Sequence, residues 1–284
     1  MSQIHVIFAG TPAFALPSLE ALASDPAFSV DLVITQPDKP AGRRGIVTPP
    51  PVKVAALRLK LPVWQPNNIN AEALERDLAC DFLVAVAYGQ ILSDAVLSLP
   101  KVAPINLHAS LLPRWRGASP IQHTLLAGDS ETGVTVQQMV KELDAGPILA
   151  QLRTPISTRE TFPILHDRLS AMGAELLLKT LRSPLQPRPQ ERTGVTLCKK
   201  LTRANGSVDP KTMTAEEIDR AVRALNPWPG VTLGTVKILA ANTQQTTGSI
   251  PLACKDGTTL HLARVQPSGG TPMTGAEWER GKRQ

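Results

Sequence analysis

The chain lacks long hydrophobic runs. Although 42% of its 284 residues are hydrophobic, the longest apolar stretches, such as residues 82–87, are far shorter than the roughly 20 residues that span a bilayer. The N-terminus has neither the basic region nor the apolar stretch of a signal peptide, and it predicts a first strand instead. We therefore expect a cytoplasmic protein with a real hydrophobic core and no membrane partner.

Cysteine is also scarce. The three cysteines, Cys80, Cys198 and Cys254, are odd in number and widely spaced, which provides neither a disulfide framework nor a metal knuckle and fits a reducing compartment. None of the five histidines pairs with another at the spacing of metal ligands. The sequence therefore predicts no metal site.

Nucleotide-binding fingerprints are missing as well. The chain contains neither the G-x-G-x-x-G spacing of dinucleotide folds nor a G-x-x-x-x-G-K-[ST] phosphate loop. Gly10-Thr11-Pro12 instead predicts a turn from strand to helix, with Thr11 as the helix cap and Pro12 in the first turn.

The net charge of +6 is unevenly distributed. Residues 186–204 contain five basic residues against one acid. Phosphate neutralisation by such a cluster would favour a polyanionic partner. A solvated basic linker explains the same cluster equally well, so both interpretations stay open at this point.

Residues 1–180 alternate short apolar runs with amphipathic segments, which is typical of an α/β protein with a mostly parallel, Rossmann-like sheet. Leucines recur at helical spacing between residues 161 and 182 and predict a packed helix. The expected strands are 4–9, 29–35, 82–87, 102–107 and 133–139.

A proline-rich stretch at 184–189 interrupts this pattern. After a linker, a helix is expected over 215–225, followed by short strand-like segments separated by glycine-rich turns, at 232–240, 249–253 and 258–265. Such short strands predict a small, OB-like β-barrel. The predicted organisation is a catalytic domain over 1–185, a basic linker over 186–206 and the barrel over 207–284.

Asn106 and His108 are the strongest candidates for chemistry. Side chains two residues apart on a strand share one face, and ligands bind at the carboxyl ends of strands in open α/β sheets. An amide donor beside an imidazole can stabilise negative charge on a carbonyl oxygen. By spacing alone, however, a structural histidine is as good an explanation of His108.

Other motifs are ambiguous. A serine-hydrolase pairing of Ser110 with His108 is weak, because Ser110 lies in no G-x-S-x-G elbow. Asp144 precedes a Gly-Pro turn, where aspartate usually makes local backbone bonds. The Gly- and Pro-rich loop at 38–53 carries several cations that could contact phosphates, although such loops are often merely exposed, and we expect it to have no regular structure.

Taken together, these motifs resemble the methionyl-tRNA formyltransferase family, over essentially the whole chain. The matching stretches are Phe8-Ala9-Gly10-Thr11-Pro12, Thr35-Gln36-Pro37-Asp38-Lys39-Pro40-Ala41-Gly42-Arg43, Val86-Ala87-Tyr88-Gly89, residues 106–117, Leu143-Asp144-Ala145-Gly146 and Asn226-Pro227-Trp228-Pro229-Gly230. The Asn-x-His pair with a downstream Asp is shared by the wider group of 10-formyltetrahydrofolate transferases, whereas the Pro-Arg-Trp-Arg-Gly run, the basic loop and the Asn-Pro-Trp-Pro stretch favour the tRNA member.

The resemblance implies formyl transfer from 10-formyltetrahydrofolate, as co-substrate, to the α-amino group of methionyl initiator tRNA. Asn106 and protonated His108 would stabilise the oxyanion, and Asp144 would orient His108 and help to move a proton. No metal would be needed, and a monomer is expected.

The resemblance also assigns binding residues. Folate would contact Val86, Ala87, Tyr88, Gly89, Ser110, Leu111, Leu112, Pro113 and Arg114. The methionine end would lie near Pro12 and Phe14, and the tRNA would be held by Lys39, Arg43, Arg44, Lys199, Lys200 and Arg203.

Two departures from the family pattern stand out. Gly45, Ile46 and Val47 occupy positions where the family usually carries further lysines, which predicts a weaker hold of this loop on tRNA. Residues 201–210 also lack the family's usual acidic stretch ending in Asp-Trp, and the C-terminal domain is short.

Three rival hypotheses share some of these features. The chain could formylate another amine, such as an amino-sugar nucleotide or glycinamide ribonucleotide, or it could transfer the formyl group to water. It could also be a tRNA-binding protein with a decayed catalytic domain, but the intact set of Asn106, His108 and Asp144 argues against decay.

Overall fold

The computed structural model describes residues 3–41, 45–76 and 78–281. These residues form two compact units. The first comprises the described residues within 3–117, 132–154 and 166–197, and the second comprises residues 118–131, 155–165 and 198–281. The division is therefore not a single cut in the sequence, because two internal segments group with the C-terminal residues.

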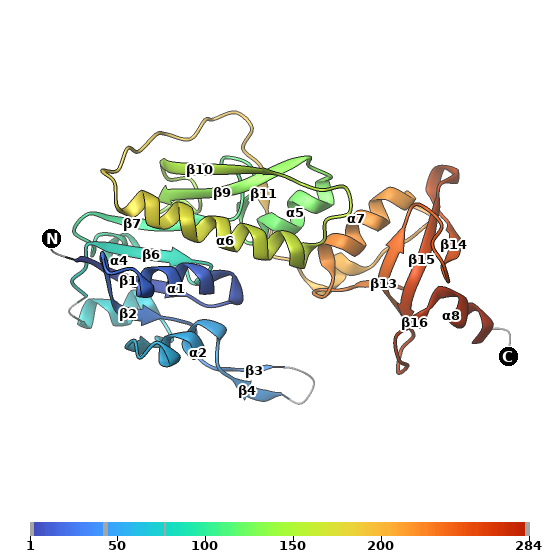
Figure 1. Ribbon diagram of the computed structural model, residues 1–284, viewed down its shortest axis with the longest axis horizontal. Coiled ribbons are helices and arrows are strands. Elements are labelled where there is room, and N and C mark those ends of the chain that lie inside the picture. Colours follow the sequence, from blue (N-terminus) through green and yellow to red (C-terminus); the bar gives the residue numbers. More distant parts are fainter. Residues whose placement is uncertain (1–2, 42–44, 77, 282–284) are drawn as a thin grey trace. The chain divides into compact units, whose positions relative to one another are not determined.

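The first unit contains a seven-stranded sheet (Figure 1). Its strand order is β10-β9-β7-β6-β1-β2-β5. The strands are β1 (Ile4–Gly10), β2 (Phe28–Ile34), β5 (Val63–Trp64), β6 (Phe82–Val86), β7 (Ala103–His108), β9 (Glu131–Gln138) and β10 (Ile148–Pro155). Adjacent strands from β7 to β5 are parallel, whereas β9 pairs antiparallel with β7. The predicted mostly parallel α/β sheet is confirmed.

The strand order reverses between β1 and β6. The chain passes from β1 to β2 on one side, then returns to build β6 and β7 on the other. Such a switch point opens a crevice at the carboxyl ends of the strands, where ligands bind in α/β folds. Gly10 at the end of β1 allows close packing there, because an added Cβ would lie 2.8 Å from the Phe8 ring and 3.2 Å from the Val86 carbonyl oxygen.

The helices around this sheet explain the composition of its strands. All residues of β6 are buried, as are Val6 to Gly10 of β1, which is expected where apolar material covers both faces of a parallel sheet. The predicted helix over 161–182 is confirmed at Phe162–Leu181, and its leucines 165, 169 and 177 are fully buried. The helices are α1 (Leu16–Ser24), α2 (Pro51–Arg58), α3 (Ile69–Glu72), α4 (Asp94–Leu97) and α6 (Phe162–Leu181).

Two local predictions are wrong. Thr11 does not cap a helix, since α1 begins at Leu16 after a short 3₁₀ turn and the Thr11 hydroxyl instead donates to the Tyr88 carbonyl at 2.7 Å. The loop at 38–53 contains regular structure, because β3 (Lys39–Ala41) pairs antiparallel with β4 (Ile46–Thr48). A two-stranded ribbon has free edges, where a proline such as Pro40 is tolerated.

The second unit consists of helices and antiparallel strands. The predicted helix over 215–225 is confirmed as α7 (Ala215–Leu225), which begins with a capping box between Thr214 and Glu217. Helix α5 (Pro120–Ala127) packs against α7. The strands are β12 (Val231–Leu233), β13 (Val236–Asn242), β14 (Ile250–Ala253), β15 (Thr259–Gln266) and β16 (Met273–Thr274), and α8 (Gly275–Gly281) follows.

The antiparallel strands of this unit form a five-stranded sheet in the order β12-β13-β15-β14, with β16 also on β15 (Figure 1). The C-terminal domain of antiparallel strands is therefore confirmed. The expected continuous strand at 232–240 is wrong, because Gly234 adopts a φ of +57° and turns the chain between β12 and β13. Two residues separate these strands, a common length for a hairpin turn.

A short ladder pairs β8 (Arg116–Gly117) with β11 (Leu197–Cys198). It brings the segment after the proline-rich stretch beside the residues that follow β7. No helix among the described residues is long and apolar enough to cross a membrane.

Candidate active site

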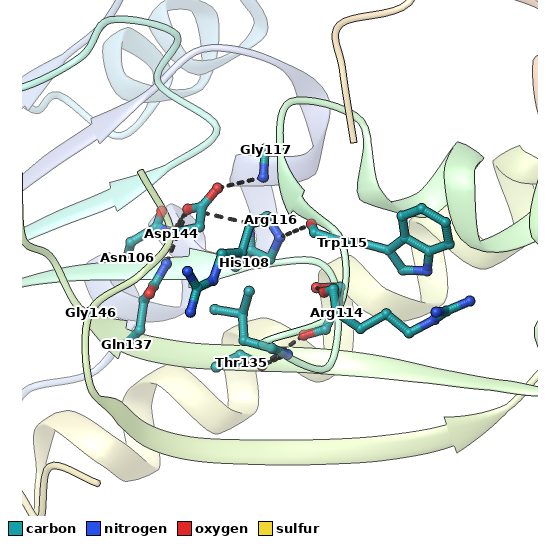
Figure 2. A network of polar contacts seen from close by, with 12 residues as sticks. Asn106, His108, Arg114, Trp115, Arg116, Gly117, Thr135, Gln137, Asp144 and Gly146 are labelled. Carbon is teal, nitrogen blue, oxygen red and sulfur yellow. Dashed lines mark hydrogen bonds and ion pairs between the residues drawn. The ribbon is translucent and has the colours of Figure 1, made fainter. Parts of the chain in front are cut away.

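Asn106 and His108 lie at the carboxyl end of strand β7. β7 is the neighbour of β6, where the strand order reverses. β7 lies between β6 and β9. Asn106 is paired with Ala85 of β6 and with Gln137 of β9, and His108 is paired with Thr135 of β9. His108 is 6% exposed. The two side chains point to the same face, as the strand period predicts, and both reach Asp144 (Figure 2).

Asp144 lies in the loop between β9 and β10. One carboxylate oxygen accepts hydrogen bonds from Asn106 Nδ2 at 3.3 Å and from Gln137 Nε2 at 3.0 Å. The other accepts the backbone N–H of Gly117 at 2.8 Å. Three donors from three segments therefore fix this carboxylate (Figure 2).

His108 faces an oxygen at each ring nitrogen. Nδ1 lies 3.6 Å from Asp144 Oδ1, and Nε2 lies 2.9 Å from the carbonyl oxygen of Trp115. A carbonyl can only accept, so Nε2 must carry a proton. Nδ1 faces the Asp144 carboxylate across 3.6 Å, so both ring nitrogens are directed at oxygen atoms.

Ser110 does not serve as a nucleophile for His108 in this arrangement. Its hydroxyl is fully buried and donates to the Arg114 carbonyl oxygen at 2.6 Å. The Ser110 carbonyl in turn accepts from the Thr135 hydroxyl at 2.7 Å. Ser110 thus shapes the loop after β7, and the serine-hydrolase alternative loses its only geometric basis.

The predicted folate-binding residues follow two neighbouring strands. Val86 ends β6 and residues 87–89 come directly after it, while residues 110–114 follow β7. Because β6 and β7 are parallel neighbours, these two loops emerge at the same edge of the sheet. Ala87 and Gly89 are exposed there with φ of +49° and +91°.

Tyr88 lies between them, 4% exposed. Burial raises the pKa of its phenol above the usual range. Its hydroxyl has no hydrogen-bond partner among the described residues, and its backbone carbonyl accepts from Thr11. Tyr88 therefore joins the loop after β6 to the turn after β1.

The residues predicted for the methionine end lie in that turn. Pro12 is exposed, and Phe14 is buried with its ring edge-on to His166 at 5.4 Å between centroids. The Phe14 carbonyl accepts from Ser170 at 2.7 Å. Helix α6 thus anchors the segment that starts α1.

The predicted tRNA contacts are scattered over both units. Lys39 is exposed on β3, with its ammonium 3.4 Å from the Gln36 side-chain oxygen. Lys199, Lys200 and Arg203 are exposed in the second unit. Arg43 and Arg44 lie outside the described residues.

Two contributors to the site were not predicted. Gln137 is 1% exposed on β9, and a glutamine within an apolar strand could have been recognised as a buried polar group that needs a partner. The Gly117 N–H carries no side-chain signal, so sequence could not identify it. Within the described ranges, no group of three or more His, Cys, Asp or Glu residues could hold a metal ion.

Comparison with known proteins shows the family of this chain. The "Formyl transferase" family model matches residues 2–181, and the "Formyl transferase, C-terminal domain" model matches residues 200–283. A methionyl-tRNA formyltransferase from Halorhodospira halophila is 46% identical over 98% of this chain and 96% of its own length. The chain belongs to the methionyl-tRNA formyltransferase family.

Other members of the family agree in length as well as sequence. The methionyl-tRNA formyltransferase of Xylella fastidiosa strain 9a5c is 43% identical over 99% of this chain and 98% of its own. Among solved structures, an N-formyltransferase from Helicobacter canadensis, in complex with folinic acid and dTDP-3-aminofucose, superposes with a TM-score of 0.70 at 18% identity. That match covers 92% of this chain and 99% of the other. It establishes a common fold.

Proposed function

We propose that this protein transfers the formyl group of 10-formyltetrahydrofolate to the α-amino group of methionyl initiator tRNA. The observation that carries the proposal is the convergence of Asn106 and His108 on the carboxylate of Asp144, in a chain that is 46% identical to a protein named for this activity. The product would be N-formylmethionyl-tRNA for translation initiation.

The chemistry follows from these three side chains. The amine attacks the formyl carbon, a C–N bond forms, and the carbonyl oxygen of the formyl group becomes negative in the tetrahedral intermediate. The Asn106 amide donates one N–H to Asp144 and has a second N–H for this oxyanion. Preorganised donors of this kind lower the barrier because they match charge that develops only in the transition state.

His108 supplies the second donor. Its Nε2 proton is directed at the Trp115 carbonyl, so donation to the oxyanion requires an exchange of that carbonyl for the substrate oxygen. Asp144 stabilises the charged imidazole and assists proton movement. The amine loses a proton, the bond from carbon to folate N10 breaks, and N10 gains a proton.

The binding residues are assigned as follows. Folate contacts the two loops that follow β6 and β7, at residues 86–89 and 110–114, and the methionyl group lies near Pro12 and Phe14. The tRNA contacts are Lys39, Arg43, Arg44, Lys199, Lys200 and Arg203. We assign catalysis to residues 1–185, the linker to 186–206 and tRNA binding to 207–284, in a monomeric cytoplasmic enzyme.

The deciding experiment measures formyl transfer from 10-formyltetrahydrofolate to methionyl initiator tRNA. We expect a wild-type rate that falls about 10²–10³-fold in His108→Ala and is unchanged in His5→Ala, an exposed histidine at the opposite end of β1. A wild type that leaves charged tRNA unmodified but formylates a nucleotide-linked amino sugar, or releases formate, would overturn the assignment of the acceptor.

A further inference from the structure

The segment after the proline-rich stretch forms part of the catalytic unit. Arg188 and Ile148 exchange both backbone hydrogen bonds, at 2.8 and 2.9 Å. Thr196 accepts the backbone N–H of Trp115 on its hydroxyl at 2.8 Å and that of Arg116 on its carbonyl at 2.9 Å. The chain between Arg188 and Thr196 is therefore attached at both ends to residues flanking the active site.

Gln190 lies within this attached segment and uses its whole side-chain amide. Its Nε2 lies 2.8 Å from the carbonyl oxygens of both Asp144 and Gly146. Its Oε1 accepts from Arg116 Nη2 at 2.7 Å and Nε at 3.0 Å. Nε2 also lies 3.3 Å from the side-chain oxygen of Gln137, which itself donates to Asp144. The two N–H donors of the amide therefore face three acceptors around the Asp144 turn.

The turn that Gln190 holds is conformationally demanding. Asp144 adopts a φ of +52°, in the left-handed region that a residue with a Cβ disfavours. Gly146 has no room for a side chain, since an added Cβ would lie 1.8 Å from the Gln138 carbonyl oxygen. Such a backbone persists only where its surroundings over-determine it, and the two bonds from Gln190 provide part of that restraint.

The same glutamine also fixes the other side of the carboxylate. Arg116, whose side chain is 12% exposed, is held by Gln190 and immediately precedes Gly117. The Gly117 N–H donates to Asp144 Oδ2 at 2.8 Å. Gln190 thus restrains both the backbone that carries Asp144 and the strand that supplies one of its donors.

We infer that Gln190 is a positioning residue for catalysis, which holds the Asp144 carboxylate against His108 and Asn106. The inference rests on the proposed function only for the choice of reaction in which its effect is measured. It assigns to the connecting segment a role in formyl transfer that is separate from tRNA binding.

The main test is Gln190→Glu, which keeps an oxygen for Arg116 and removes both donors to the turn. We expect the single-turnover rate of formyl transfer to fall at least about tenfold, while KM for tRNA and for folate changes less than threefold. Gln3→Glu is the control, because Gln3 Nε2 also lies near two backbone carbonyls, those of Pro26 and Phe28, at the opposite end of the sheet. It should retain the wild-type rate.

A double-mutant cycle with Asp144→Asn separates positioning from general destabilisation. If Gln190 acts through Asp144, Gln190→Glu will change the rate less than threefold in the Asp144→Asn background, because effects of residues that act as a unit are non-additive. Equal rate losses in both backgrounds, or no loss in the single variant, would overturn the inference. Should Gln190→Glu fail to fold, Gln190→Asn keeps the same groups on a shorter side chain and should show the same pattern.

A readout that needs no acceptor makes this test independent of the proposed function. The ring ¹⁵N resonances of His108, assigned with His108→Ala, should shift in Gln190→Glu and stay unchanged in Gln3→Glu. If wild type fails to formylate methionyl-tRNA, the proposed acceptor is wrong, but this spectral comparison still decides the role of Gln190. Unshifted His108 resonances in Gln190→Glu would reject it.

Discussion

The Nε2 atom of His108 lies 2.9 Å from the carbonyl oxygen of Trp115. This contact fixes the proton on Nε2 and leaves Nδ1 to face Asp144. Trp115 itself adopts a φ of +61°, so the loop after β7 turns its carbonyl towards the imidazole at a conformational cost. The His108 ring is thus oriented by backbone on one side and by a carboxylate on the other.

Asp144→Asn should slow catalysis strongly without unfolding the protein. The amide oxygen can still accept from two of the three donors, but the side chain loses the charge that faces His108, and its NH₂ opposes the third donor. We expect a loss in kcat of at least about 100-fold, comparable to removal of an oxyanion donor. Steady-state kinetics with methionyl initiator tRNA measure it, and a kcat within threefold of wild type would contradict a catalytic role.

A buried ionic cluster should stabilise the second unit. Asp219 is 3% exposed and accepts from Arg159 Nη1 on both oxygens at 2.7 Å and from Arg223 Nε at 2.9 Å. Asp219→Ala removes the carboxylate that the two guanidinium groups share, although each keeps a backbone acceptor, at Ala241 and Glu160. It should lower the free energy of unfolding by about 3 kcal/mol.

The matched control is Glu216→Ala on the same helix. Glu216 pairs with Arg220 at 3.1 Å, but its side chain is 74% exposed, so the expected change is at most about 0.5 kcal/mol. Urea unfolding followed by circular dichroism compares the two variants. Equal changes in the free energy of unfolding would show that the buried Asp219 cluster stabilises the protein no more than an exposed ion pair does.

Lysines on the β3–β4 hairpin should strengthen tRNA binding. Ile46 and Val47 are each 62% exposed beside the loop proposed to contact tRNA. The double variant Ile46→Lys/Val47→Lys should raise tRNA affinity and steepen the plot of log K against log salt by about 1–2. The control, Leu74→Lys/Val102→Lys, adds the same charge at positions that are 60% and 55% exposed. If both double variants change the slope of log K against log salt equally, the hairpin makes no specific contribution to tRNA binding.

Alkaline pH should destabilise the fold partly through Cys80. Burial raises the pKa of this thiol from 9.0 to about 11, so the unfolded chain loses the proton first as pH rises. The contribution to stability is therefore intact below about pH 9 and lost between about 9 and 11.

Cys80→Ala isolates this effect from Tyr88, whose pKa is raised in the same direction. The unfolding free energy of wild type, measured in urea from pH 8 to 11, should fall more steeply than that of the variant. Parallel curves would show that the buried thiol does not titrate differently in the two states.

Local sequence patterns were sufficient to predict a strand or helix wherever the pattern of apolar residues matches their burial. Residues 82–86 are apolar because β6 is covered on both faces, and Thr214 with Glu217 marks the start of α7 as a capping box. The two-residue period also placed Asn106 and His108 on one face. These features depend on neighbours along the chain, which a sequence displays directly.

What only the tertiary structure decided is how distant segments complete the site. Asp144 is 36 residues from His108 by number, Gln190 is 46 from Asp144, and the Gly117 donor is a backbone group without a side-chain signature. The hairpin at β3–β4 and the engagement of Thr11 with Tyr88 likewise depend on partners that no local pattern reveals. Sequence alone determined that Asn106 and His108 share one face of β7, because side-chain direction follows from strand geometry. Folding determined which remote polar groups form hydrogen bonds with these side chains, because buried donors and acceptors are matched in space rather than along the chain.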